Sequence, residues 1–386
     1  MDYQSTRLAD YTEDSSIKRG TFDLPFLLLT ILLLTIGVIM VLSASFARAY
    51  YDPGNETGGN ATYYFTRQLF FAVSGIAIMF ALSKFPMVFF RRISGIFMAV
   101  SIGFLVLVLI LGVVGGGSRR WINLGVTTFQ PSEITKLAVI LTFASMICKR
   151  KGKMKDFKVG ILPFGLILAG IVFLLVLEPH LSASIIIIAI GAIMLFAGGA
   201  EAKWFIGGIA AVALVGIIIV NFMPYASTRI TTWLDPFSDI SKDGYQIVQS
   251  LYSIGSGGVL GLGLGQSRQK YLYLPEEHND FIFAIVCEEL GFIGAFLILA
   301  LFAMLIIRGY WLALHAKDKF SSLVITGITS LLALQVFLNV AVVTNLIPCT
   351  GISLPFFSYG GTAMWIQLAE IGIVLSASRD INRGQI

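Results

Sequence analysis

Acidic side chains gather where a polar segment of this chain meets a strongly apolar one. The stretch YLPEEHNDFIFAIVCEELGFIGA, residues 273–295, places three carboxylates and a histidine at the start of the apolar run and two carboxylates inside it: Glu276, Glu277, His278, Asp280, Glu288 and Glu289. A carboxylate at the mouth of an apolar helix is partly desolvated, which raises its pKa toward the range useful for a general base. The segment is therefore a candidate site for chemistry that needs a base.

The sequence predicts different roles for these carboxylates. Glu276 and Glu277 precede the apolar run and are interpreted as solvated loop side chains, with a supporting or metal-binding role as the alternative. Glu288 and Glu289 lie two turns deeper and, as neighbours in a helix, point about 100° apart. At least one of them is expected to be a structural hydrogen-bond partner.

A second pair of charges falls inside another apolar run. FQPSEITKLAVI places Glu133 and Lys136 three residues apart, on one face of a helix, where they can pair and so lower the cost of burying either. Two interpretations stay open: an ion pair that holds a helix bundle together, or the lining of a polar cavity. Just upstream, Arg119, Arg120 and Trp121 form either an interfacial anchor or a site for a lipid phosphate, which paired arginines can bind with bidentate contacts.

The elements that must position these residues are membrane-spanning helices. Hydrophobic residues make up 56% of the 386 residues and charged residues 13%, about half the charged share of a soluble domain. Ten apolar runs, several of them long enough to cross about 30 Å of hydrocarbon, predict an all-α polytopic membrane protein. They are centred in 24–43, 69–82, 93–114, 134–148, 159–177, 183–199, 205–222, 281–307, 323–346 and 363–377.

The basic residues predict the orientation of these spans. With the N-terminus in the cytoplasm, inside segments hold 18 of the 27 Lys and Arg residues and outside segments hold eight, although the outside segments include the longest loop. We therefore expect a cytoplasmic N-terminal arm (1–22), a ten-helix domain (23–378) with a large outer loop (223–280), and a cytoplasmic tail (379–386). The polar, acidic arm is not a cleavable signal peptide, and the net charge of +5 reflects topology rather than a nucleic-acid surface.

The outer loop has structure of its own. GYQIVQSLYSI predicts a short amphipathic helix with Ile247, Leu251 and Ile254 on its apolar side. The glycine-rich GSGGVLGLGLG that follows has no preceding strand, so a nucleotide-binding loop is disfavoured and tight turns or close backbone approach are expected. NLIPCTGISLPFFSYGG, residues 345–361, has the profile of an irregular loop, which is tolerated at membrane depth where it is buried in protein or lines a cavity. The three cysteines have no metal-site spacing.

Three long motifs carry a resemblance to a known family. GGGSRRWINLG with FQPSEITKLA, the segment from DPFSDISKDGYQ to FAIVCEELG, and GISLPFFSYGGTAMW resemble the SEDS (shape, elongation, division and sporulation) proteins of bacteria, in the same order and spacing. The likeness covers essentially all ten spans. SRQKYLYLPEEHNDFIF and SLYSIGSGG are more similar to the FtsW and SpoVE branch than to the RodA branch.

The resemblance implies a peptidoglycan glycosyltransferase of the bacterial cytoplasmic membrane that joins lipid II into glycan strands at the outer face during division or sporulation. It implies as ligands lipid II and undecaprenyl-pyrophosphate-linked glycan, and as partners a class B penicillin-binding protein and division or sporulation proteins. Asp280 corresponds to the family's essential acidic position, and we interpret it as the general base. The candidate substrate-binding residues are Glu133, Lys136, Arg119, Arg120, Trp121, Glu277, Arg268 and Lys270.

Glycosyl transfer from a lipid diphosphate also needs positive charge at the leaving group. Arg229 is a further available cation. A divalent cation, Mg²⁺ or Mn²⁺, is compatible with this chemistry, although the sequence has no dedicated ligand cluster and no metal ligands are assigned.

One motif departs from the family pattern. The family commonly has Glu or Gln followed by Pro-Asp-x-Gly-Thr after the fifth span, whereas this chain reads EPHLSA, so that His180 replaces the acid. A role carried by that Asp is therefore in doubt here. Two rival classes are weighed against the polymerase: a flippase or transporter of a lipid-linked precursor, which also needs charges in the membrane but for which no matching interrupted helices are found, and a division scaffold.

Overall fold

Long apolar runs become helices because a backbone in hydrocarbon has no hydrogen-bond partner but itself. The computed structural model describes residues 20–51, 57–115, 118–123, 128–150, 152–222, 224–238, 240 and 244–381. Within them, nine helical segments are long and apolar enough to cross a membrane. They are α2 (Leu24–Tyr51), α3 (Tyr63–Leu82), α4 (Met87–Leu111), α5 (Pro131–Lys149), the π-helical turn η1 (Phe157–Ile161) continued by α6 (Leu162–Leu177), α7 (Leu181–Gly198), α11 (Ile282–Leu314), α12 (Lys319–Val343) and α13 (Gly361–Ser378).

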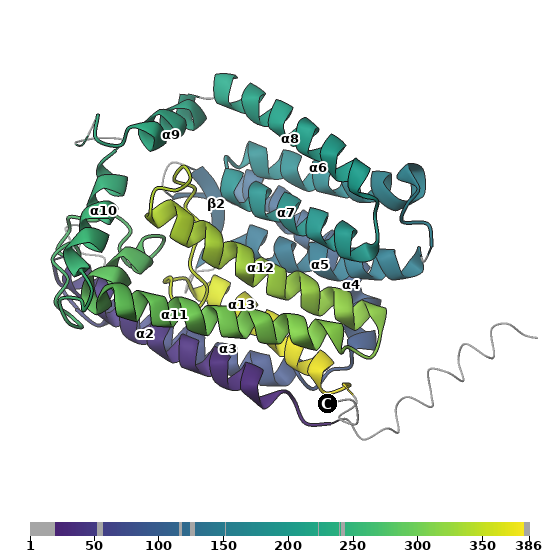
Figure 1. Cartoon of the computed structure of the whole chain (residues 1–386), viewed down its shortest axis with the longest axis horizontal. Coiled ribbons are helices and arrows are strands. Elements are labelled where there is room, and N and C mark those ends of the chain that lie inside the picture. Colours follow the sequence, from purple (N-terminus) through teal and green to yellow (C-terminus); the bar gives the residue numbers. More distant parts are fainter. Residues whose placement is uncertain are drawn as a thin grey trace, which may run out of the picture.

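The remaining predicted span, 205–222, coincides with α8 (Ala202–Phe222), which is also helical. Figure 1 shows α8 along the outside of the bundle, beyond α6 and α7. The prediction of an all-α polytopic fold is confirmed. Residues 1–19 and 382–386, most of the predicted arm and tail, lie outside the described residues.

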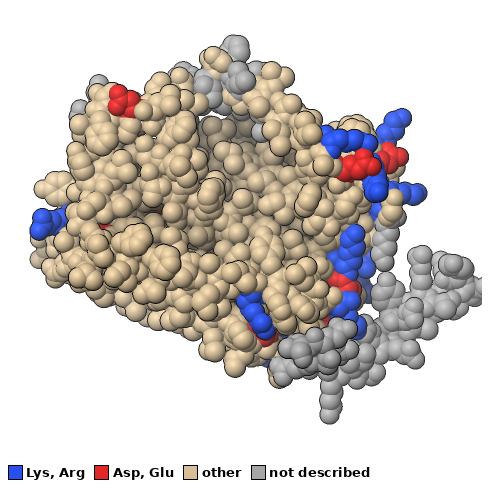
Figure 2. Space-filling view, viewed as in Figure 1, with Lys and Arg blue, Asp and Glu red and all other residues tan. Residues whose placement is uncertain are grey.

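The two ends of the bundle differ. At one end, on the left of Figure 1, lie α9 (Pro224–Leu234), α10 (Tyr245–Gly257) and the segment 258–281. We call this the loop end. Figure 2 shows Lys and Arg side chains gathered chiefly at the opposite end, which we call the basic end.

A small sheet also lies near the loop end, and the sequence did not predict it. Strands β1 (Val113–Gly115), β2 (Ser118–Asn123) and β3 (Thr128–Phe129) pair antiparallel in the order β1-β2-β3, between α4 and α5. Because successive side chains of a strand point to opposite faces, this sheet separates Arg119 from Arg120.

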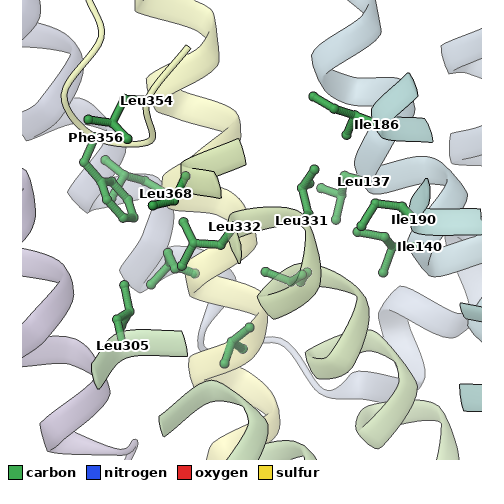
Figure 3. Packing of buried hydrophobic residues seen from close by; sticks show 14 of the residues in the cluster. Leu137, Ile140, Ile186, Ile190, Leu305, Leu331, Leu332, Leu354, Phe356 and Leu368 are labelled. Atoms are coloured by element: carbon green, nitrogen blue, oxygen red, sulfur yellow. The ribbon is translucent and has the colours of Figure 1, made fainter. Parts of the chain in front are cut away.

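The core of the bundle is apolar and is built from its central helices. Figure 3 shows Leu137 and Ile140 of α5 facing Ile190 of α7 and Leu331 of α12. In the same figure Leu354 and Phe356 of the 344–360 loop lie beside Leu368 of α13, so this irregular loop is itself part of the core. The loop therefore holds a fixed position relative to the spans.

The glycine-rich segment after α10 crosses α11 in close contact. A Cβ on Gly257 would lie 2.0 Å from the carbonyl oxygen of Cys287, and one on Gly261, at φ +80°, would lie 2.3 Å from that of Glu289. The helix itself is interrupted there at Gly291, at φ +65°. The expected close backbone approach is confirmed: only glycine allows the loop and α11 to meet this tightly.

The predicted amphipathic helix is α10, but its buried side differs from the expectation. Ile247 is buried, while Leu251 and Ile254 are only half-buried. Ser250 donates to the carbonyl oxygen of Val343 (2.8 Å) and Ser253 to that of Ala284 (3.0 Å). The helix therefore packs through its serines against α11 and α12, because these hydroxyls find carbonyl partners in the bundle.

Candidate active site at the loop end

Asp280 lies two residues before α11 begins, in a half-buried position at the loop end. Its backbone carbonyl accepts a hydrogen bond from Asn339 of α12 (2.8 Å), whose amide also bonds the carbonyl of Ile352 (2.7 Å). Asn339 thus ties the mouth of α11 to the 344–360 loop. These contacts fix the backbone that carries the carboxylate.

The surroundings of Asp280 give it the properties of a base. The pKa of Asp280 is raised to about 6: burial is the largest cause and Glu276 adds to it, while Arg229, Arg120 and His278 act in the opposite direction. A carboxylate with this pKa is ionised at neutral pH yet is a stronger proton acceptor than a solvated one. Two arginines reach it electrostatically from different elements, Arg120 from β2 and Arg229 from α9.

Gly351 lies directly against the carboxylate. It has φ +67°, and a Cβ placed on it would lie 3.1 Å from Oδ2 of Asp280. We predict that Gly351→Ala destabilises the protein by about 1 kcal/mol, because the left-handed conformation is strained for alanine, and that it lowers turnover by displacing the carboxylate. Unfolding in detergent and initial rates measure the two effects. The control is Gly95→Ala, where an added Cβ meets open space. Unchanged turnover in Gly351→Ala would contradict close packing around Asp280.

The intramembrane pair is formed as the sequence predicts. Nζ of Lys136 lies 2.8 Å from both carboxylate oxygens of Glu133, and both residues are buried near the start of α5. Glu370 of α13 interacts electrostatically with both of them. One lysine thus interacts with two carboxylates, Glu133 directly and Glu370 electrostatically.

A polar cluster adjoins this pair. It consists of Arg120, Gln130, Glu178 and His180. Arg120 donates to the carbonyl oxygen of Pro179, and Nε2 of His180 lies 3.3 Å from the amide nitrogen of Gln130. Oε1 of Glu178, Nδ1 of His180 and Nε of Arg120 are buried without a hydrogen-bond partner.

Neither titratable side chain of this polar cluster, Glu178 or His180, is charged at neutral pH. Burial raises the pKa of Glu178 to about 8, with Arg120 acting against the shift. Burial, Arg120 and Lys136 together lower the pKa of His180 to about 3. With His180 in place of the family acid, this part of the site has one negative charge fewer beside Arg120.

Other predicted residues lie apart from Asp280. Lys270 is buried and pairs with Glu289 of α11 (2.9 Å), which also accepts from Ser43 of α2 (2.6 and 2.7 Å). The neighbouring Glu288 accepts from Ser253 (3.0 Å) and Ser267 (2.5 Å). Both carboxylates are thus structural partners, as was expected of at least one, and they anchor the glycine-rich segment to α11.

Glu277 is not the solvated loop carboxylate that the sequence suggested. Its side chain is fully buried and lies 3.2 Å from Arg48 of α2, which supplies the compensating charge. The next residue, His278, packs against the rings of Tyr64 and Tyr359, with centroids 4.5 and 5.7 Å away. Arg119 and Arg268 are exposed, and Trp121 is half-buried in β2.

Several residues of the site region were not predicted from the sequence as site residues. Gln130, Thr350 and Gly351 lie in the quoted FQPSE and CTGISLP stretches but carry no charge, and Arg229 was only one of several cations. Arg229 donates to the carbonyl oxygen of Cys349, and Ser182 donates to that of Thr350, so both hold the 344–360 loop beside the site. Among the described residues no group of three or more His, Cys, Asp and Glu side chains is arranged to hold a metal ion.

Comparison with known proteins decides the family. The family model described as "Cell cycle protein", which covers FtsW, RodA and SpoVE, matches residues 24–383. The chain belongs to this family. It is 42% identical to stage V sporulation protein E of Bacillus subtilis over 366 residues, 94% of this chain and 98% of that protein. It is 38% identical to the probable peptidoglycan glycosyltransferase FtsW of Geobacter sulfurreducens over 361 residues, 92% of this chain and 95% of that protein.

Solved structures of the FtsW/RodA/SpoVE family share the fold. A chain from a peptidoglycan synthase complex, described as coordinating polymerization and crosslinking, matches with a TM-score of 0.78 and 26% identity, covering 94% of this chain and 99% of that one. The rod shape determining protein RodA of Thermus thermophilus matches with a TM-score of 0.68 and 25% identity, over 94% of this chain and 98% of that one. The described helices of this family member thus follow a known membrane fold.

Proposed function

We propose that this member of the FtsW/RodA/SpoVE family is a peptidoglycan glycosyltransferase that polymerises lipid II, with Asp280 as its general base. The observation that carries the proposal is a half-buried carboxylate of raised pKa at the mouth of a membrane-spanning helix, with two arginines close enough to act on it electrostatically. The names of the relatives supply the substrate class.

The chemistry follows from these groups. A sugar hydroxyl of the acceptor attacks the anomeric carbon of the donor, a new C–O bond forms, and the C–O bond to the diphosphate breaks. Asp280 takes the hydroxyl proton, and Arg120, Arg229 and Lys136 offset the negative charge that the departing diphosphate carries. In a water-poor site each of these charge interactions is stronger than at the surface.

The orientation is part of the proposal. The loop end, with Asp280, faces the outside of the cytoplasmic membrane, and both termini lie in the cytoplasm. The concentration of Lys and Arg at the basic end supports this arrangement, because positive residues are retained on the cytoplasmic side. The active site then meets lipid II in the leaflet where glycan strands are built.

The partner is proposed to be a class B penicillin-binding protein acting in division or sporulation. The support is that a structural relative belongs to a synthase complex that joins polymerization to crosslinking. A Mg²⁺ or Mn²⁺ ion would be held mainly by the diphosphate, and it would add positive charge at the leaving group.

The rate of polymerisation is predicted to depend on the ionisation of Asp280. The base must be deprotonated, and its folded-state pKa is about 6. The initial rate is therefore expected to rise as pH increases through about 6 and to level off above 7. Rates measured between pH 5 and 8, with lipid II saturating at each pH, test this. A rate that is flat from pH 5 to 7 would contradict the assignment.

One experiment separates the transferase from the rival transporter of a lipid-linked precursor. The purified protein and its partner are reconstituted in vesicles with labelled lipid II, and both glycan length and the leaflet of the label are measured. The transferase predicts polymer of many disaccharides. Unpolymerised lipid II that crosses the bilayer would favour the transporter instead.

A further inference from the structure

A cavity of about 310 Å³ lies between α9, α10 and the 344–360 loop. It is distinct from the polar cluster and from the Glu133–Lys136 pair, which lie on β2, α5 and the α6–α7 connection. Its lining includes Thr228, Arg229, Thr232, Trp233, Gln246 and Cys349. Arg229 belongs both to this lining and to the surroundings of Asp280, so the cavity adjoins the candidate base.

The walls of the cavity are tied together. The indole nitrogen of Trp233 donates to the carbonyl oxygen of Asn345 (3.1 Å), and the amide of Asn345 donates back to that of Trp233 (3.3 Å). Arg229 donates to the carbonyl oxygen of Cys349, and Gln246 donates to that of Pro275 (3.4 Å). Helix α9 is therefore fixed to the loop, and α10 to the segment that leads to Asp280. Preformed walls lower the cost of binding a ligand.

The chemistry of the lining selects one kind of ligand. Two threonine hydroxyls and a glutamine amide can both donate and accept hydrogen bonds, and an indole offers a flat amphipathic surface. A prenyl chain would match the apolar side chain of Ile247 but not the hydroxyl and amide groups of this lining. A diphosphate would meet only one cation here. A neutral, hydroxyl-rich ring satisfies both the polar groups and the indole, and a cavity of this size is at the lower end of those that hold small ligands.

Glycosyl transfer needs such a ring beside the base. The donor carries the diphosphate, which suits the cationic side of Asp280 around Arg120 and Lys136. The acceptor presents a neutral sugar whose hydroxyl must lie within reach of the carboxylate. We propose that the cavity of Trp233, Thr228, Thr232 and Gln246 binds the acceptor sugar and directs its attacking hydroxyl toward Asp280.

This inference rests on the proposed function. It assigns the two substrates to different elements: the charged donor to β2 and α5, and the neutral acceptor sugar to α9 and α10. Trp233 and Thr232 are then binding residues for the acceptor, and Arg229 both lines the cavity and acts electrostatically on Asp280.

The test is the dependence of the initial polymerisation rate on lipid II concentration, measured with the full-length protein and its partner. Trp233→Ala is expected to raise the half-saturating concentration by about tenfold, with the maximal rate within about threefold of the parent. Trp233→Phe retains an aromatic ring, so its half-saturating lipid II concentration should lie within about threefold of that of the parent. Thr232→Val, which removes one hydroxyl at constant shape, should raise it by about three- to tenfold.

Trp204→Ala is the matched control, because Trp204 lies at the start of α8, away from the cavity lining. It should leave half-saturation unchanged. If Trp233→Ala does not fold, Thr232→Val decides the question. Half-saturation within twofold of the parent in the folded Trp233 and Thr232 variants would overturn the inference, as would a fall in maximal rate alone. A parent that makes no polymer would instead overturn the proposed function, and with it this inference.

Discussion

Asp280→Asn is expected to lower the rate of glycan polymerisation by about 10²- to 10⁴-fold, the contribution typical of a positioned general base. The amide keeps the shape of the side chain but cannot accept the proton at neutral pH. Initial rates at pH 7.5 with saturating lipid II, for parent and variant in parallel, measure this effect.

The same substitution should not destabilise the protein. Burial raises the pKa of Asp280 to about 6, which means that its ionised form is disfavoured in the folded state. Removing that charge therefore leaves the stability at neutral pH equal to or above that of the parent. Asp235→Asn, at an exposed carboxylate beside α9, is the control and should retain the parent rate. An Asp280→Asn variant that polymerises within threefold of the parent would remove the base from its assigned position.

Lys270→Met is expected to produce the largest loss of stability. Lys270 pairs with Glu289 in a buried position, where each side chain is 3% exposed or less. Without the lysine, Glu289 keeps its hydrogen bonds to Ser43 and Ser267 but has an uncompensated charge. Breaking a buried pair on one side costs about 3–5 kcal/mol. Unfolding of the purified protein in detergent measures the change.

Two further variants test the reason for this loss. Lys270→Met combined with Glu289→Gln should recover much of the stability, because no unpaired charge remains. Arg268→Ala removes an exposed cation two residues away and should change the stability by less than about 0.5 kcal/mol. A Lys270→Met variant as stable as the parent would show that the pair does not anchor the glycine-rich segment.

The membrane-spanning helices were predictable from the sequence because the hydrogen bonds that form each helix lie within one continuous segment. Each apolar run must satisfy its backbone within itself, so run length alone identifies the helix. The Glu133–Lys136 pair was equally local, since a spacing of three residues fixes both side chains on one helical face. The glycines of the 255–265 segment likewise indicated close backbone contact before any partner was known.

The surroundings of Asp280 were less predictable because they come from distant parts of the chain. Gly351, Asn339 and Arg229 meet this carboxylate only through folding, and none of them belongs to a pattern around residue 280. The burial of Glu277 and Lys270 was missed because each is compensated by a partner outside its own local segment: Arg48 lies 229 residues from Glu277, and Glu289 lies 19 residues from Lys270. A charged side chain in a loop is usually solvated. It is buried here because an oppositely charged side chain, brought close by folding, compensates its loss of water.

The length and position of the three strands explain why the sequence did not predict the small sheet. Strands of two, three and six residues are too short to give a clear alternating pattern, and they follow a helix without a polar linker. Their consequence for function is nevertheless large, because the alternation of β2 sends Arg120 to Pro179 and leaves Arg119 exposed.

The joining of sugars by this protein itself is the activity proposed above. It is tested most directly by incubating the purified protein, together with a class B penicillin-binding protein, with labelled lipid II, and by measuring product length against the penicillin-binding protein alone. Long glycan strands are expected only when this protein is present. Lipid II that remains unpolymerised under conditions in which the complex is assembled and folded would contradict it.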